Sequence, residues 1–129
     1  MLSNHGGRQL DGALSSIAAM PAIADALHGE LELHMDGGVR SGQDVMKALA
    51  CGAHAVYIGR AFLYGLGAQG EAGVTRCLEI IRGELDLTMA LCGITDVHRI
   101  DGRALVEGGH VRMPTAVAEP APRACVQAA

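Results

Sequence analysis

The residues best suited to chemistry stand near the start of the chain, in the segment Ser3-Asn4-His5-Gly6-Gly7-Arg8. A neutral imidazole such as that of His5 can accept a proton at physiological pH. Arg8, three residues further on, can hold a carboxylate through two parallel hydrogen bonds. The pair therefore has complementary chemistry for a substrate that bears a carboxylate. A structural or surface role for His5 is the alternative that the residues alone leave open.

Two glycine-containing turns, at residues 36–40 (DGGVR) and 59–60 (GR), each follow an expected strand and precede an expected helix or helical turn. Glycine lets backbone amides approach a phosphate, a helix N-terminus adds positive potential, and arginine supplies a charge-assisted fork. Consecutive loops late in a barrel are a recurrent phosphate site. The turns thus predict phosphate binding, unless the glycines only make tight turns and the arginines only face solvent. Asp36 could accept hydrogen bonds from a ribityl or ribose hydroxyl, or simply form a turn.

These turns need strands and helices to position them, and the sequence supplies both in alternation. Strands are expected at residues 31–35 and 53–58, and residues 1–3 are at most the end of another strand. Alternating strands and helices are typical of consecutive βα units around a parallel sheet. Glu32 and His34 interrupt the first strand, which indicates that it is partly exposed. The expected fold class is α/β.

The expected helices begin and end at recognisable residues. Pro21 suits the first turn of a helix that continues to about Leu27. Ser41 and Asp44 form an S-x-x-D capping box for a helix that ends near residue 50.

A short helical turn at residues 61–66 is expected before a longer helix at 71–91, which Gly93 should end. The apolar stripe of this longer helix is expected to contain Val74, Leu78, Ile81, Leu85 and Met89. Residues 101–129 have no periodic pattern, so we expect an irregular or disordered tail there.

Composition argues against several classes of protein. The formal net charge is -4 and the basic residues neither cluster nor alternate with aromatic ones, so nucleic acid is not an expected partner. No window reaches the roughly 18 apolar residues of a membrane span, which makes a cytoplasmic location the default. The four cysteines lack a C-x-x-C spacing and the histidines lack metal-ligand spacing, so we predict neither a disulfide framework nor a metal site.

Three ordered segments together resemble a known family: SNHGGRQLDGA at 3–13, DGGVRSGQDVMKALACGA at 36–53, and IGRAFLYGL at 58–66. They are similar to the FMN-dependent α-hydroxy-acid dehydrogenases and oxidases over roughly residues 1–100. The resemblance implies a TIM (β/α)8 barrel, FMN as cofactor and oxidation of a (S)-2-hydroxy acid of the lactate, glycolate or mandelate type to the 2-oxo acid.

The resemblance also implies a role for each residue of the motifs. His5 is the implied active-site base and contacts the substrate, and Arg8 is the implied ligand of the substrate carboxylate. The implied FMN-binding residues are Ser3, Asp36, Gly37, Gly38, Val39, Arg40, Gly59 and Arg60.

A complete barrel of this type needs about 250 residues, whereas this chain has 129. We therefore expect residues 1–100 to be the C-terminal part of such a barrel, with about two and a half βα units, inactive alone. Two alternatives remain open: a non-catalytic FMN- or phosphate-binding half-barrel, and a half-barrel that associates with a separate N-terminal half. The sequence is also compatible with a homo-oligomer and with peripheral membrane association of the parent enzyme. Another flavin or nucleotide barrel would share the phosphate loops without needing SNHGGRQLD.

Overall fold

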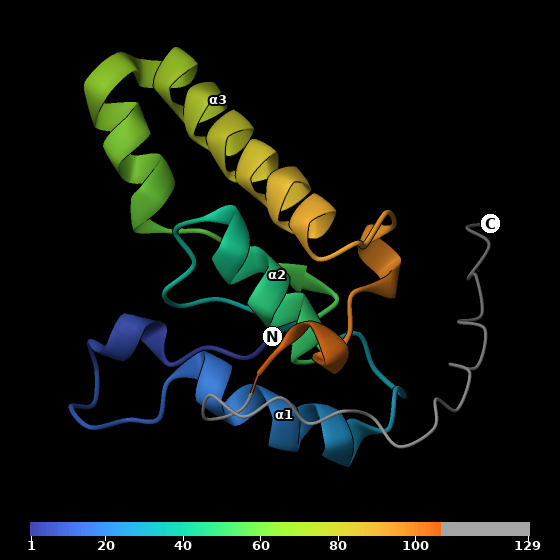
Figure 1. Cartoon of the computed structure of the whole chain (residues 1–129). Coiled ribbons are helices and arrows are strands. Elements are labelled where there is room, and N and C mark those ends of the chain that lie inside the picture. Colours follow the sequence, from blue (N-terminus) through green and yellow to red (C-terminus); the bar gives the residue numbers. More distant parts are fainter. Residues whose placement is uncertain (107–129) are drawn as a thin grey trace, which may run out of the picture.

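The computed structural model describes residues 1–106 (Figure 1). The predicted tail from residue 107 onward therefore lies outside the described residues. The elements are, in chain order, the 3-10 helix η1 (His5–Gly7), α1 (Ser16–Leu27), β1 (His34–Met35), α2 (Gly42–Ala50), β2 (Ala55–Val56), α3 (Arg60–Leu91), and the 3-10 helices η2 (Val97–Arg99) and η3 (Gly102–Ala104).

Three chain segments run parallel to form the centre of the fold. β1 pairs with β2 so that Met35 lies opposite Val56. On its other side Met35 forms a parallel bridge with Leu2. The expected α/β class and parallel order are confirmed. The strands are shorter than predicted, since each contains two residues, although the backbone bond from Tyr57 N–H to the Met35 carbonyl (2.8 Å) extends the pairing by one step.

One face of this sheet is covered by helices. Its buried core contains the side chains of Met20, Leu33, Met35, Val39, Val45, Ala48, Ala53 and Ile81. The alternate residues of the first strand point away from that core, and Glu32 is exposed while His34 is half-buried. His34 Nδ1 lies 3.3 Å from the Tyr57 hydroxyl. The partial exposure expected of this strand is confirmed.

Helix α1 begins earlier than predicted. Ser15 is its N-cap, and the Ser15 side chain accepts a hydrogen bond from Ala18 N–H. Pro21 therefore lies inside the helix rather than in its first turn. The predicted start was wrong because the Ser15 side chain caps the helix before Pro21. The stabilisation from a start at this cap outweighs the cost of a proline inside the helix.

Helix α2 begins as predicted. The Ser41 side chain accepts from Asp44 N–H and the Asp44 carboxylate accepts from Ser41 N–H, which is the complete capping box. The helix ends at Ala50, as expected.

Helix α3 joins the two helical segments that the sequence separated. It bends at Gln69 and at Gly70, where φ is 60° and ψ is -138°. The two limbs fold back on each other, on the opposite side of α2 from α1 in the view of Figure 1. Gly65 and Gly73 make this possible, because a Cβ atom on Gly73 would overlap the carbonyl oxygen of Gly65.

The buried stripe of the second limb differs from the predicted one at Leu78. Ile81 and Met89 are buried as expected, but Leu78 is 51 % exposed. Cys77, one position earlier, packs against the core instead. Gly93 ends the helix as predicted: Ile94 N–H donates to the Met89 carbonyl at 2.9 Å, which is the bond of a Schellman motif.

After α3 the chain returns to α2. Ile100 is 4 % exposed and joins Met46, Ala50 and Met89 in a second apolar cluster. Within the segment predicted to be irregular, η3 forms one short turn capped by the Asp101 side chain. None of the helices within residues 1–106 is both long and apolar enough to cross a membrane.

Three of the four cysteines are described, and Cys51, Cys77 and Cys92 are free thiols. Burial raises the pKa of the Cys51 thiol. Cys125 lies outside the described residues.

Candidate functional site

The predicted site residues follow three neighbouring parallel segments. Leu2, Met35 and Val56 share one register across the sheet. The segments that follow them therefore leave the sheet at the same edge, its carboxyl edge. The structure thus brings the His5 turn, the turn at 36–40 and the Gly59-Arg60 pair to one side of the fold.

The first turn holds its histidine in an unusual backbone conformation. His5 has φ of 56°, in the left-handed region that non-glycine residues seldom adopt. Its backbone N–H donates to Ser3 Oγ at 3.0 Å, and Gly7 N–H donates to the Asn4 carbonyl at 3.0 Å. Such strain persists where the surroundings impose it, often at ligand sites.

The side chains of His5 and Arg8 are both exposed. Within residues 1–106 neither the imidazole nor the guanidinium makes a hydrogen bond or ion pair with the protein. Both groups are therefore available to a ligand that approaches the carboxyl edge of the sheet.

The second turn touches the first. A Cβ atom on Gly37 would lie 3.0 Å from Ser16 Oγ and 3.1 Å from Asn4 Oδ1. Asn4 N–H in turn donates to Ser16 Oγ at 3.3 Å. The glycine at 37, where φ is 90°, thus permits a close approach between the two motif turns. Asn4 and Ser16 were not singled out from the sequence, because only the folded register places them beside Gly37.

Asp36 contains the one buried side-chain polar atom of the described residues that has no hydrogen-bond partner, its Oδ1. The backbone N–H of Asp36 is satisfied by the Leu2 carbonyl at 3.1 Å. Buried polar groups are nearly always paired, so an orphan acceptor at the carboxyl edge of a sheet marks a candidate ligand contact.

Three backbone amides at and just before the start of α2 are bonded to protein carboxylates. Asp44 Oδ2 accepts from Arg40 N–H and Ser41 N–H at 3.0 and 3.1 Å. Glu84, on α3, accepts from Gly42 N–H at 2.8 Å. The Val39 side chain is buried in the core, so it is not available to a ligand, whereas the Arg40 side chain is exposed.

The start of α3 has the opposite character. Its N-cap is Gly59, which has no side chain to accept from the first amides. Arg60 follows and is exposed. Unsatisfied amides at a helix N-terminus, together with the helix dipole, favour an anion. Of the two helix starts near the motif turns, only that of α3 has no side-chain cap hydrogen bond.

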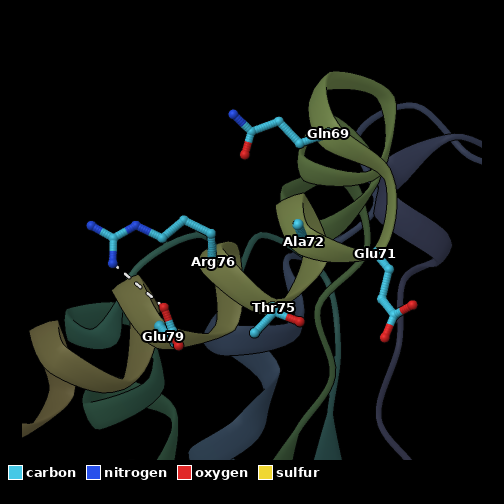
Figure 2. Close-up of a pocket in the computed structure, with 6 residues that line it drawn as sticks. All are labelled: Gln69, Glu71, Ala72, Thr75, Arg76 and Glu79. Atoms are coloured by element: carbon cyan, nitrogen blue, oxygen red, sulfur yellow. Dashed lines mark hydrogen bonds and ion pairs between the residues drawn. The ribbon is translucent and has the colours of Figure 1, made fainter.

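One surface hollow lies elsewhere, at the bend of α3, with a volume of about 830 Å³. Figure 2 shows its lining, in which Arg76 and Glu79 form an ion pair at 3.4 Å. It is open to solvent and contains none of the motif residues, so we place the candidate site at the carboxyl edge of the sheet. Among residues 1–106 no three His, Cys, Asp or Glu side chains are grouped so that they could hold a metal ion.

Comparison with known proteins identifies the family. The sequence profile of a family described as FMN-dependent dehydrogenase matches residues 1–107. The chain belongs to the FMN-dependent dehydrogenase family. Its cofactor class is therefore FMN, which confirms the flavin implied by the three motifs.

Relatives in this family support the assignment over most of the chain. An L-lactate dehydrogenase of Caulobacter vibrioides (strain NA1000 / CB15N) is 56 % identical over 107 residues, which cover 83 % of this chain and 28 % of the relative. An L-lactate dehydrogenase of Xanthomonas campestris pv. campestris (strain B100) is 55 % identical over 105 residues, which cover 81 % of this chain and 27 % of the relative. The chain thus spans less than a third of the length of these relatives.

Solved structures of FMN-dependent relatives have the same local fold. Mandelate oxidase with (S)-2-phenylpropionate superposes with a TM-score of 0.73 and 46 % identity, over 80 % of this chain and 30 % of the oxidase. A soluble mutant of the membrane-associated (S)-mandelate dehydrogenase from Pseudomonas putida superposes with a TM-score of 0.71 and 44 % identity, over 78 % of this chain and 28 % of the dehydrogenase.

Proposed function

We propose that this chain supplies the FMN-phosphate site, the base and the carboxylate-binding residue of an enzyme that oxidises a (S)-2-hydroxy acid to the 2-oxo acid. The observation that carries the proposal is the contact between the two motif turns, where Gly37 lies against Asn4. Asp36, the residue before Gly37, contains the buried Oδ1 that has no hydrogen-bond partner. The similarity to lactate and mandelate enzymes supports the substrate class.

The residues present fit FMN. Asp36 Oδ1 is an acceptor for a ribityl hydroxyl. The uncapped amides after Gly59 and the exposed Arg60 suit its phosphate, and Arg40 brings a second guanidinium from the neighbouring turn. This combination of two late loops and a helix N-terminus is a recurrent phosphate site of barrel enzymes. Ser3, which supports the backbone of His5, completes the proposed cofactor contacts.

The remaining residues of the motif would act on the substrate. FMN, when bound, accepts the two electrons of the oxidation. The Arg8 guanidinium binds the substrate carboxylate by two parallel hydrogen bonds, which fixes the orientation of the 2-carbon. The His5 imidazole takes up a proton from the hydroxy acid. The left-handed backbone of His5, held by Ser3 Oγ, keeps the ring at the carboxyl edge of the sheet.

We further propose that the three parallel segments form part of a (β/α)8 barrel, as about two and a half of its C-terminal units. The sheet face opposite the helices carries Glu32, His34 and Tyr57, and this face would point into the barrel. Polar residues there are compatible with an interior shared with other strands, as the size of the relatives suggests.

The test is the visible absorption spectrum of the purified chain after incubation with FMN and removal of free flavin, followed by addition of L-lactate, glycolate or (S)-mandelate. Retained flavin that bleaches on addition of substrate supports the whole proposal. Retained flavin that does not bleach favours a non-catalytic FMN-binding module or a half-barrel that needs further residues. A chain that retains no flavin contradicts the cofactor site.

Substitutions assign the roles in a reconstituted full-length enzyme, with the same bleaching of bound FMN as the measurement. His5→Gln should leave FMN bound and abolish bleaching, and Arg8→Lys should raise the substrate concentration needed, because the bidentate geometry is lost. His28→Gln is a matched control, since His28 is also exposed and also has a positive φ, 46°. Bleaching by His5→Gln at the rate of His28→Gln would end the assignment of His5 as base.

A further inference from the structure

Glu84 makes a contact between two helices that the family motifs do not include. Its Oε2 accepts a hydrogen bond from the backbone N–H of Gly42 at 2.8 Å, in a partly buried position, although the two residues are 42 apart in sequence. Thr88 Oγ1 donates to the Glu84 carbonyl at 2.6 Å on the same helix. A carboxylate from the second limb of α3 thus caps the start of α2.

The two helices also meet through their backbones at this point. A Cβ atom on Gly42 would overlap the backbone nitrogen of Leu85 and would lie 2.5 Å from the Ile81 carbonyl oxygen. Only glycine allows an approach this close. The start of α2 is therefore seated directly on α3, and the Glu84 hydrogen bond fixes its position along that surface.

This contact reaches the proposed phosphate site through two residues. Arg40 precedes Gly42 by two positions, and its N–H is bonded to Asp44 Oδ2 in the same cap, which ties the turn to the start of α2. Arg60 stands at the start of α3, and the close packing of Gly65 on Gly73 fixes that limb against the limb that carries Glu84. Helix α3 therefore positions both arginines: Arg60 is its first residue, and Arg40 lies two residues before Gly42, which is bonded to Glu84.

We propose that Glu84 is a positioning residue for the flavin phosphate: through Gly42 it sets Arg40 relative to the open N-terminus of α3. The same carboxylate occupies the positive end of α2, so that the phosphate binds at α3. This inference rests on the proposed function, since it assumes that FMN binds at this site. It assigns a role to a residue that touches neither cofactor nor substrate.

The experiment compares the affinities of the 129-residue chain for FMN and for riboflavin, which lacks the phosphate, by flavin fluorescence titration. Glu84→Ala should weaken FMN about tenfold, by analogy with residues that orient metal ligands, and leave riboflavin unchanged. Glu84→Gln should bind FMN with nearly the affinity of the unaltered chain, because its amide oxygen still accepts from Gly42 N–H. Asp86→Asn is the control, an exposed carboxylate two positions away whose loss should change neither affinity.

Glu84→Asp is the second variant if Glu84→Ala fails to fold, as checked by circular dichroism. It keeps the charge but is one methylene too short to reach Gly42, so the FMN-to-riboflavin affinity ratio should fall here too. An unchanged ratio, even with both ligands weakened, would mean a purely structural role and overturn the inference, as would tighter FMN binding. If the unaltered chain binds no FMN, the proposed function itself fails and this inference falls with it.

Discussion

Replacing Asp36 with alanine should raise the stability of the free chain and lower its affinity for FMN. An unpaired buried acceptor costs about 1–3 kcal/mol, and Asp36 Oδ1 is such an acceptor. Since Asp36 is only half-buried as a whole, we take the lower end. A gain of about 1 kcal/mol corresponds to a rise in Tm of about 4 °C in a domain of this size.

The ligand complex should respond in the opposite direction. A hydrogen bond to a charged group contributes about 1.5–3 kcal/mol, and its loss corresponds to a Kd for FMN about 10- to 150-fold higher. Thermal melting without flavin and fluorescence titration with FMN measure the two effects separately. Asp11→Ala is the control, because Asp11 Oδ1 is exposed and already accepts from Gly12 N–H at 3.0 Å.

Asp11→Ala should not raise Tm and should leave FMN affinity unchanged. For Asp36→Ala, a fall in both Tm and affinity would show that the carboxylate serves the fold. An unchanged affinity would refute its role as a ligand of FMN.

Three further outcomes test the fold. Gly73→Ala should lower Tm by the equivalent of at least about 1–3 kcal/mol, because a Cβ atom there would overlap the Gly65 carbonyl; an unaltered thermal melt would contradict the packing of the two limbs. Cys51 should be alkylated by iodoacetamide more slowly than the exposed Cys92, since burial raises the pKa of the Cys51 thiol and the thiolate is the nucleophile; equal rates by mass spectrometry would refute this. A hydrogen bond from the arginine two positions on lowers the pKa of Asp101. The stabilisation it gives is therefore present above the unfolded pKa of about 3.9 and is lost as the pH falls through the folded value, so that Asp101→Asn should reduce Tm at pH 7 and match the parent chain well below that range; a difference that persists in acid would contradict the sign.

Features that depend on a few neighbouring residues could be predicted from the sequence. The capping box of α2 needs only Ser41 and Asp44, and the end of α3 needs only Gly93 and its flanking residues. The motif turns were found for the same reason, because each combines glycine with a charged residue directly after an apolar run.

Features that depend on tertiary contacts could not be predicted from the sequence. The predicted start of α1 is wrong because proline is favoured in a first turn, while the Ser15 cap six residues earlier competes with that preference. Leu78 was assigned to the wrong side of α3 because Cys77, about 100° away around the helix, is the residue that meets the core. Nothing local links Glu84 to Gly42, so their hydrogen bond could be found only in the structure.

The register that assembles the site is enforced by the core. Side chains alternate between the two faces of a strand, so Met35, which is 2 % exposed, and Asp36, which follows it, point in opposite directions. A slip of one residue in the pairing with Leu2 would turn Met35 away from the core and direct a carboxylate into it. Burying that carboxylate without a partner costs several kcal/mol, and the burial of Met35 is lost as well. The apolar packing that stabilises β1 thus also keeps Asp36 at the carboxyl edge, beside the turn that carries His5.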